Sequence, residues 1–95
     1  MVFSKRAVIH GITYTIKAPS RRKGKKYDVY VGKDDPQYLL SYGALGYEQY
    51  KDAFGYYKDL DHNDPKRRKL YRDRHHKDFK DDPSYAGYWA WNYLW

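Results

Sequence analysis

The sequence contains no cysteine and few aliphatic residues. Without thiols the chain can form neither a disulfide nor a thiolate zinc site. Leu, Ile, Val and Phe make up about a sixth of the 95 residues, and such a composition, with a net charge of +7, is typical of disordered chains. No apolar run has the length of a membrane span and Met1–Arg6 leads into no signal-peptide core, so we expect neither element.

Aromatic residues are abundant where aliphatic ones are scarce. They account for 20% of the chain, which is more than disordered segments carry. All three Trp and three of the thirteen Tyr lie within residues 83–95. A chain of this length buries only about 60–65% of the surface that its unfolded form exposes, so its core is thin. The sequence therefore predicts one small folded domain over residues 1–95.

Positive charge is concentrated near the N-terminus. Residues 1–33 carry nine Lys and Arg against a single Asp. The segment Lys17–Lys26 includes Pro and Gly and predicts an exposed basic loop. Its six cations are Lys17, Arg21, Arg22, Lys23, Lys25 and Lys26.

The basic loop has three possible uses. Its cations can release counterions from nucleic acid, and the flanking Tyr14, Tyr27 and Tyr30 can stack on unpaired bases. The loop can also dock on acidic neighbours, or it can serve solubility alone.

The N-terminal two-thirds of the chain predict strands. In residues 1–26, apolar residues alternate from Val8 to Ile16 as in a half-buried strand, with Gly11 as a bulge or a turn, before the basic loop. In residues 27–60, Tyr27–Val31 and Tyr38–Tyr42 alternate around a turn at Lys33–Gln37 and predict a hairpin. The connecting segment Tyr47–Leu60 has the spacing of a short helix.

Residues 61–95 predict two helices, one charged and one aromatic. Asp64-Pro65 and Asp82-Pro83 each combine an N-cap with a proline at the first helical position. The predicted fold class is α+β, with a small antiparallel sheet or hairpin followed by two short C-terminal helices.

One face of the charged helix collects cations and aromatics. These residues are Arg67, Arg68, Tyr71, Arg74 and His75. On a partner, guanidinium groups in this arrangement can bind phosphates or carboxylates bidentately. Alternatively the contacts are internal: Arg74 and His75 then stack on the terminal tryptophans and pair with Asp61, Asp64 or Asp78.

Aromatic rings surround the axis of the second helix. Trp89 shares a face with Tyr85 and Tyr93, whereas Trp91 and Trp95 lie on the other side. One face can close the core, so we expect other rings to remain exposed for a partner. The expected docking residues of this helix are Tyr88, Trp89, Trp91 and Trp95. A membrane interface is the competing use of such rings, but the segment lacks a cationic face, so we consider membrane binding unlikely.

The histidines do not form a catalytic pattern. Asp61-His62-Asn63 looks superficially like an HNH nuclease element, but no second metal-binding His follows at helical spacing. His75 and His76 are adjacent and point about 100° apart on a helix. We therefore expect no catalytic residue, no metal, no cofactor and no small-molecule substrate.

Several motifs together resemble a known family. They are Gly46-Tyr47-Glu48-Gln49-Tyr50, His62-Asn63-Asp64, Arg67-Arg68 with Tyr71 and Arg74-His75, and Ala86-Gly87-Tyr88-Trp89 with Leu94-Trp95. Over about residues 26–95 this combination resembles a family of short proteins encoded by large nucleocytoplasmic DNA viruses. Two features depart from the family pattern: Gln49 replaces the usual acid, and Lys51–Asp61 is an extra segment.

The resemblance implies a non-enzymatic virion structural protein of the minor capsid or cement type. Its partners would be other capsid proteins, and it would be found in the virion and, during assembly, in the host cytoplasm or nucleus. A basic nucleic-acid-binding module for genome packaging or regulation is the alternative.

Overall fold

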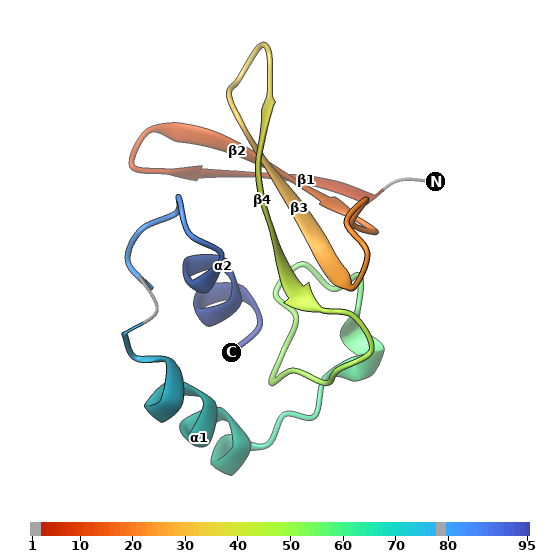
Figure 1. Cartoon of the computed structure of the whole chain (residues 1–95), viewed down its shortest axis with the longest axis vertical. Coiled ribbons are helices and arrows are strands. Elements are labelled where there is room, and N and C mark those ends of the chain that lie inside the picture. The colour runs from red at the N-terminus through yellow and green to blue at the C-terminus, as the bar shows by residue number, and fades with distance from the viewer. Residues whose placement is uncertain (1–2, 78–79) are drawn as a thin grey trace. The chain divides into compact units, whose positions relative to one another are not determined.

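The structure, a computed structural model, describes residues 3–77 and 80–95. Its contacts divide the chain into two compact units, residues 1–45 and residues 46–95. Each unit is described below by itself. The strands all lie in the first unit and the helices in the second (Figure 1).

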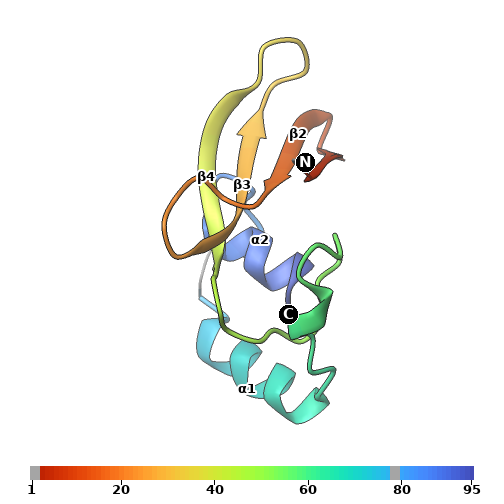
Figure 2. The same ribbon diagram turned by 90° about the vertical axis from the view of Figure 1, so that its right-hand side faces the viewer.

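Four antiparallel strands form the first unit. They are β1 (Phe3–Ile9), β2 (Ile12–Ala18), β3 (Lys25–Val31) and β4 (Gln37–Ala44), and they pair in the order β1-β2-β3-β4. With two helices following the sheet, the predicted α+β class is confirmed. The predicted hairpin is β3 and β4. Figure 2 shows the β2–β3 loop, in orange, projecting beside these two strands.

The alternating segment from Val8 to Ile16 is two strands and not one. His10 and Gly11 both have positive φ, 52° and 77°, and they connect β1 to β2 in a tight turn. Two consecutive residues with positive φ form the type of turn whose twist matches paired strands. Of the two possibilities for Gly11, a bulge or a turn, the structure shows the turn.

The register gives the sheet two different faces. Ile16 pairs with Val29, and Tyr27 with Tyr42, and all four side chains are buried. On the other face Lys17 pairs with Asp28, and Thr15 with Tyr30. A register shift after Val29 then brings Tyr38 opposite Tyr30. Polar and aromatic side chains from three strands therefore meet on this second face.

The segment Tyr47–Leu60 is not the predicted helix. Its only helical turn is η1, a 3-10 helix over Lys58–Leu60. The buried Gln49 side chain donates to the Tyr57 carbonyl at 2.9 Å and to the Asp61 carboxylate at 2.5 Å. Gly55 has φ of 85°, a left-handed conformation that interrupts a helix. Hydrogen bonds from buried polar side chains therefore hold this segment in place of helical backbone hydrogen bonds.

The two C-terminal helices differ in how they begin. Helix α1 (Pro65–His75) starts as predicted, with the Asp64 side chain accepting from the Lys66 N–H at 2.9 Å. Helix α2 (Ala86–Tyr93) starts later than Asp82-Pro83. Asp82 forms a turn instead, accepting from the Ser84 N–H at 2.9 Å through its side chain. The predicted start of the aromatic helix at Asp82-Pro83 is therefore wrong.

Candidate functional site

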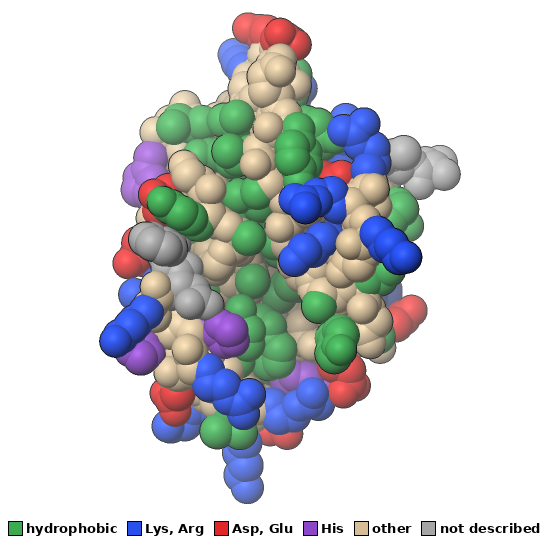
Figure 3. Space-filling model, viewed as in Figure 1, with side chains coloured by type: hydrophobic (Ala, Val, Ile, Leu, Met, Phe, Trp, Pro, Cys, Tyr) green, Lys and Arg blue, Asp and Glu red, His purple; other side chains and the backbone are tan. Residues whose placement is uncertain are grey.

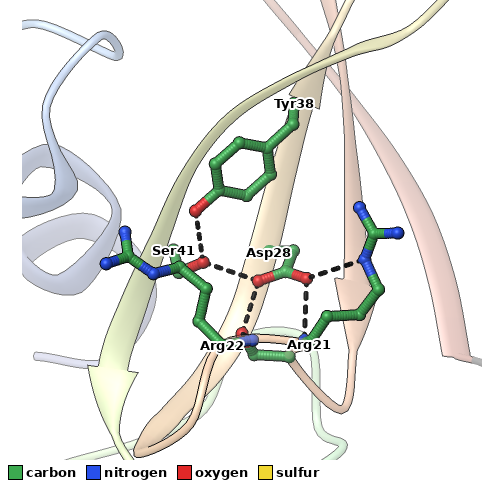
Figure 4. A network of polar contacts seen from close by, with 6 residues as sticks. Arg21, Arg22, Asp28, Tyr38 and Ser41 are labelled. Carbon is green, nitrogen blue, oxygen red and sulfur yellow. Dashed lines mark hydrogen bonds and ion pairs between the residues drawn. The ribbon is translucent and has the colours of Figure 1, made fainter.

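A buried carboxylate organises the loop between β2 and β3. Asp28 on β3 is 2% exposed. It accepts hydrogen bonds from the Ser20 hydroxyl, from the Arg21 N–H at 2.9 Å and from the Ser41 hydroxyl at 2.6 Å. The Arg21 Nε lies 4.0 Å from the same carboxylate (Figure 4). Asp28 thus ties the loop, through Ser20 and Arg21, to strands β3 and β4 of the sheet.

The directions of these hydrogen bonds follow from counting hydrogens. Ser41 has one hydroxyl hydrogen and donates it to Asp28. The Tyr38 hydroxyl, 2.7 Å away, must therefore donate to Ser41. Ser20 likewise donates to Asp28 and accepts from the Arg22 N–H at 3.0 Å. The Asp28 network therefore positions Tyr38 as well as the two arginines.

The same network keeps Asp28 ionised. Burial alone would raise the pKa of Asp28. The hydrogen bonds from Arg21, Ser20 and Ser41, with the positive charge of Arg21, outweigh burial and hold the pKa of Asp28 below its ordinary value. The carboxylate is a satisfied structural anion at the base of a cationic loop.

Cations lie above the aromatic rings of this face. The Lys17 Nζ is 4.8 Å and the Arg21 guanidinium carbon 5.8 Å from the centre of the Tyr30 ring. These are cation–π distances, so Tyr30 holds two of the cations in place. Figure 3 shows Lys and Arg side chains gathered around β3 and the loop that precedes it.

A hollow of about 380 Å³ opens beside the loop. It is lined by Arg21, Arg22, Asp28 and Tyr38. The Arg21 side chain is 77% exposed, and Tyr38 is 42% exposed. The hollow therefore has a fixed floor, a cationic rim and one accessible aromatic ring.

The predicted basic loop over Lys17–Lys26 is only partly a loop. Arg21, Arg22 and Lys23 lie in the exposed loop, and Lys25 is exposed at the start of β3. Lys17, near the end of β2, is half-buried. Lys26 is only 2% exposed and belongs to β3. Placing Lys26 and the half-buried Lys17 of β2 in an exposed loop is therefore wrong.

The aromatic partners of the cluster also differ from the prediction. Tyr14 and Tyr27 are 5% and 0% exposed, so neither can stack on a base. Tyr38 is 42% exposed and is the accessible ring instead. Its position depends on the register shift between β3 and β4, which no local sequence pattern shows. The remaining members form what we call the loop site. They are Lys17, Arg21, Arg22, Lys23, Lys25, Tyr30 and Tyr38.

The predicted docking residues of α1 are largely engaged inside the second unit. Arg68 donates to the Trp95 carbonyl oxygen at 2.7 Å and lies 4.8 Å from the Tyr50 ring. Tyr71 stacks on Trp95 with ring centres 4.3 Å apart. Arg67 pairs with Glu48 at 3.0 Å. Internal contacts therefore use much of the face that we considered for a partner.

The internal contacts use other residues than those predicted. Arg72, absent from the prediction, lies 4.8 Å from the Trp91 ring and donates to the Trp95 carbonyl oxygen at 3.2 Å. Arg74 is exposed, and His75 stacks on Tyr71 at 4.2 Å instead of on a tryptophan. Asp78 lies outside the described residues.

The rings of α2 follow the predicted division into faces, but both faces are used. Trp89 is fully buried, and its indole N–H donates to the Pro83 carbonyl at 2.9 Å. Tyr88, Trp91 and Trp95 are half-buried. The prediction that Trp89 docks a partner is therefore wrong, because no surface of this ring is accessible. Trp91 and Trp95 keep part of their surface, although side chains of α1 contact both.

His62 packs against the aromatic rings of the second unit. Its Nδ1 accepts from the Asp64 N–H at 2.9 Å, and its ring centre is 5.2 Å from that of Trp95. Its Nε2 is buried without a hydrogen-bond partner. Burial, and next the positive charge of Arg67, hold the pKa of His62 below its ordinary value.

Within residues 3–77 and 80–95, no three His, Asp or Glu side chains group together as metal ligands would. No helix in the described part of the chain is both long and apolar enough to cross a membrane.

Comparisons with protein-family models, with curated proteins and with solved structures found no match to this chain.

Proposed function

We propose that this protein is a non-enzymatic basic protein that binds nucleic acid through the loop site. The observation that carries the proposal is the loop itself. The buried Asp28 and its partner Ser20 bind the backbone N–H groups of Arg21 and Arg22, so the loop that carries the exposed cations is ordered before any ligand arrives. Order of this kind lowers the entropy lost on binding.

The distribution of charge supports the proposal. Residues 1–45 carry nine Lys and Arg against three Asp, a net charge of +6. Residues 46–95 carry ten Lys and Arg against nine Asp and Glu, a net charge of +1. A local cationic field of this kind attracts phosphate backbones and releases their counterions.

A charge-reversal experiment tests the proposal. The triple variant Arg21→Glu, Arg22→Glu, Lys23→Glu should weaken binding to a short labelled oligonucleotide at least tenfold, because phosphate contacts dominate such affinity. The matched control is Lys51→Glu, Lys66→Glu, Lys77→Glu, whose three lysines are exposed in the second unit.

Both variants change the net charge equally, so a difference between them locates the binding surface. Equal loss of affinity in the two would show that the whole molecule attracts the strand and that the loop is no site. Binding that persists unchanged in the loop variant would reject the proposal.

A second candidate is a minor capsid or cement protein that docks onto larger virion proteins, as the sequence resemblance implies. The observation that favours it is three strongly exposed tyrosines in the second unit. These are Tyr47 at 72%, Tyr56 at 43% and Tyr85 at 44%. Exposed aromatic side chains are frequent at interfaces.

The two candidates differ in what the protein accompanies when particles are opened. A cement protein stays with empty particles at high salt, whereas a nucleic-acid-binding protein leaves with the genome. We place nucleic-acid binding first because the predicted docking residues of α1 and α2 are largely occupied inside the unit.

A further inference from the structure

We infer that the hollow of the loop site receives one unpaired base of a single-stranded nucleic acid, stacked on Tyr38, with the neighbouring phosphates on Arg21 and Arg22. This inference rests on the proposed function and names the class of nucleic acid that the site selects. It starts from a difference between Tyr30 and Tyr38, the two tyrosines of the loop site.

Tyr30 and Tyr38 have different roles. The Tyr30 ring is covered by this protein's own cations, Lys17 and Arg21. Tyr38 is 42% exposed and lines the hollow. The two rings meet edge to face, with centres 5.8 Å apart and planes at 78°. Tyr30 therefore supports the site, and Tyr38 presents the accessible ring.

Tyr38 is held at both ends of its ring. Tyr30 contacts the ring, and the hydroxyl donates to Ser41 at 2.7 Å, which in turn is bound to Asp28 (Figure 4). A ring fixed in this way loses little side-chain entropy when a base stacks on it. Base–aromatic stacking tolerates every base, because each has a π-face.

The carboxylate in the hollow does not oppose a phosphate. Asp28 accepts three hydrogen bonds, which occupy most of its lone pairs. The Arg21 guanidinium beside it offsets its negative charge. The exposed guanidinium groups of Arg21 and Arg22 determine the potential at the rim. Planar guanidinium groups suit phosphate oxygens.

The cost of extruding a base favours a single strand over a duplex. The hollow is open to solvent and has a volume of about 380 Å³, so a base can enter it. A base in a duplex is already stacked and paired, and extruding it has a cost. An unpaired strand offers its base without that cost.

The experiment compares four probes on the full chain. They are a labelled oligothymidylate, the same strand with abasic sites, a duplex of equal length, and heparin as an anion without bases. The variants are Tyr38→Ala and Tyr38→Phe, and the control Tyr47→Ala removes a more exposed tyrosine of the second unit.

The wild-type protein should bind the oligothymidylate more tightly than the abasic strand or the duplex. Tyr38→Ala should weaken oligothymidylate binding by about five- to a hundredfold, as the loss of one stacked base predicts. Heparin and duplex affinities should change little. Tyr38→Phe keeps the ring and should lie between Tyr38→Ala and the wild type, and Tyr47→Ala should match the wild type.

Failure of the inference and failure of the proposed function are distinguishable. If Tyr38→Ala lowers affinity for all probes equally or for none, while the loop charge reversal lowers it for all, the stacked base is rejected and nucleic-acid binding stands. If the wild-type protein binds no probe, both are rejected. Should Tyr38→Ala fail to fold, the comparison of intact and abasic strands on the wild-type protein still decides the inference.

Discussion

Asp28 shows how a single residue can fix a functional loop. It is buried on the second face of the sheet, where three hydrogen bonds and one arginine surround it. From the sequence it is merely the one acid among the first 33 residues. Its structural role depends on burial and on hydrogen bonds from Ser20, eight residues before it, and Ser41, thirteen residues after it.

Asp28→Asn should destabilise the protein by about 3 kcal/mol at neutral pH, because hydrogen bonds to a charged group contribute about 1.5–3 kcal/mol each and the amide would present donors to donors. The pKa of Asp28 is lowered in the folded state from its ordinary 3.8. Its stabilisation is therefore present above about pH 3.8 and lost as pH falls through the lower folded value. Urea unfolding of both proteins at several pH values measures this difference.

The control for Asp28→Asn is Asp34→Asn, in an exposed turn. It should leave stability within about 0.5 kcal/mol of the wild type. A wild-type advantage over Asp28→Asn that stayed constant down to the lowest pH would contradict the role of the charged form.

His62 predicts a second loss of stability at low pH. Here the folded state favours the neutral form of the side chain, whereas at Asp28 it favours the charged form. Its folded pKa lies below the ordinary value of 6.5, because burial and Arg67 disfavour the cation more than Glu48, Asp61 and Asp64 favour it. The unfolded chain then binds the proton more readily. The stabilisation from neutral His62 is therefore complete above about pH 6.5 and is lost as pH falls from there toward the folded pKa.

Thermal unfolding between pH 8 and pH 5 measures this effect. The Tm of the wild type should fall as the pH is lowered. The Tm of His62→Asn should fall less, because asparagine keeps an acceptor for the Asp64 N–H but does not titrate. His76→Gln is the control, since His76 is exposed. Identical pH profiles for the wild type and His62→Asn would show that His62 is not responsible.

At the scale of elements, two tryptophans of α2 allow the stability contribution of a buried ring to be compared with that of a half-buried ring. Trp89→Ala should cost about 3–5 kcal/mol, the usual range for a buried tryptophan, since the ring is fully buried and its N–H is bonded. Trp91→Ala removes a half-buried ring and its contact with Arg72. It should cost about 1–2 kcal/mol, mainly from partial burial and one cation–π contact.

Equilibrium urea unfolding of the two variants gives both values. The two substitutions remove the same side chain from one helix, so each is the matched control of the other. Equal losses would mean that the exposed fraction of these rings does not determine their contribution to stability.

Elements with local signals could be predicted, and elements held by distant partners could not. Asp64-Pro65 determines the start of α1 within a few residues, and alternation around a turn gives the β3–β4 hairpin. The segment Tyr47–Leu60 has helical spacing of aromatics, but the buried Gln49 and its bond to Asp61 determine its structure. The hollow beside Tyr38 likewise depends on a register shift that no local pattern shows.

The position of Gln49 explains why an amide suits it. The Gln49 amide donates to the Asp61 carboxylate at 2.5 Å. An acid at this position would place two carboxylates in contact, which is unfavourable.

At the scale of the whole molecule, the contacts divide the chain into units of residues 1–45 and 46–95, whereas the sequence predicts one domain. Chains below about 40 residues usually need disulfides, metals or a partner to fold, and units slightly larger than that are marginal alone. This chain has no cysteine. We therefore expect the two units to unfold in one cooperative transition.

The positions of the tryptophans make this testable without added labels. All three lie in residues 46–95, so their fluorescence reports the second unit, whereas amide NMR signals of β2 and β3 report the first. In urea the two signals should change at the same midpoint, because coincident transitions are the mark of two-state unfolding. Trp89→Ala, whose substituted residue lies in the second unit, should lower both midpoints together. If the β2 and β3 signals instead kept their wild-type midpoint in Trp89→Ala, the chain would consist of two independent domains and the single-domain prediction would be wrong.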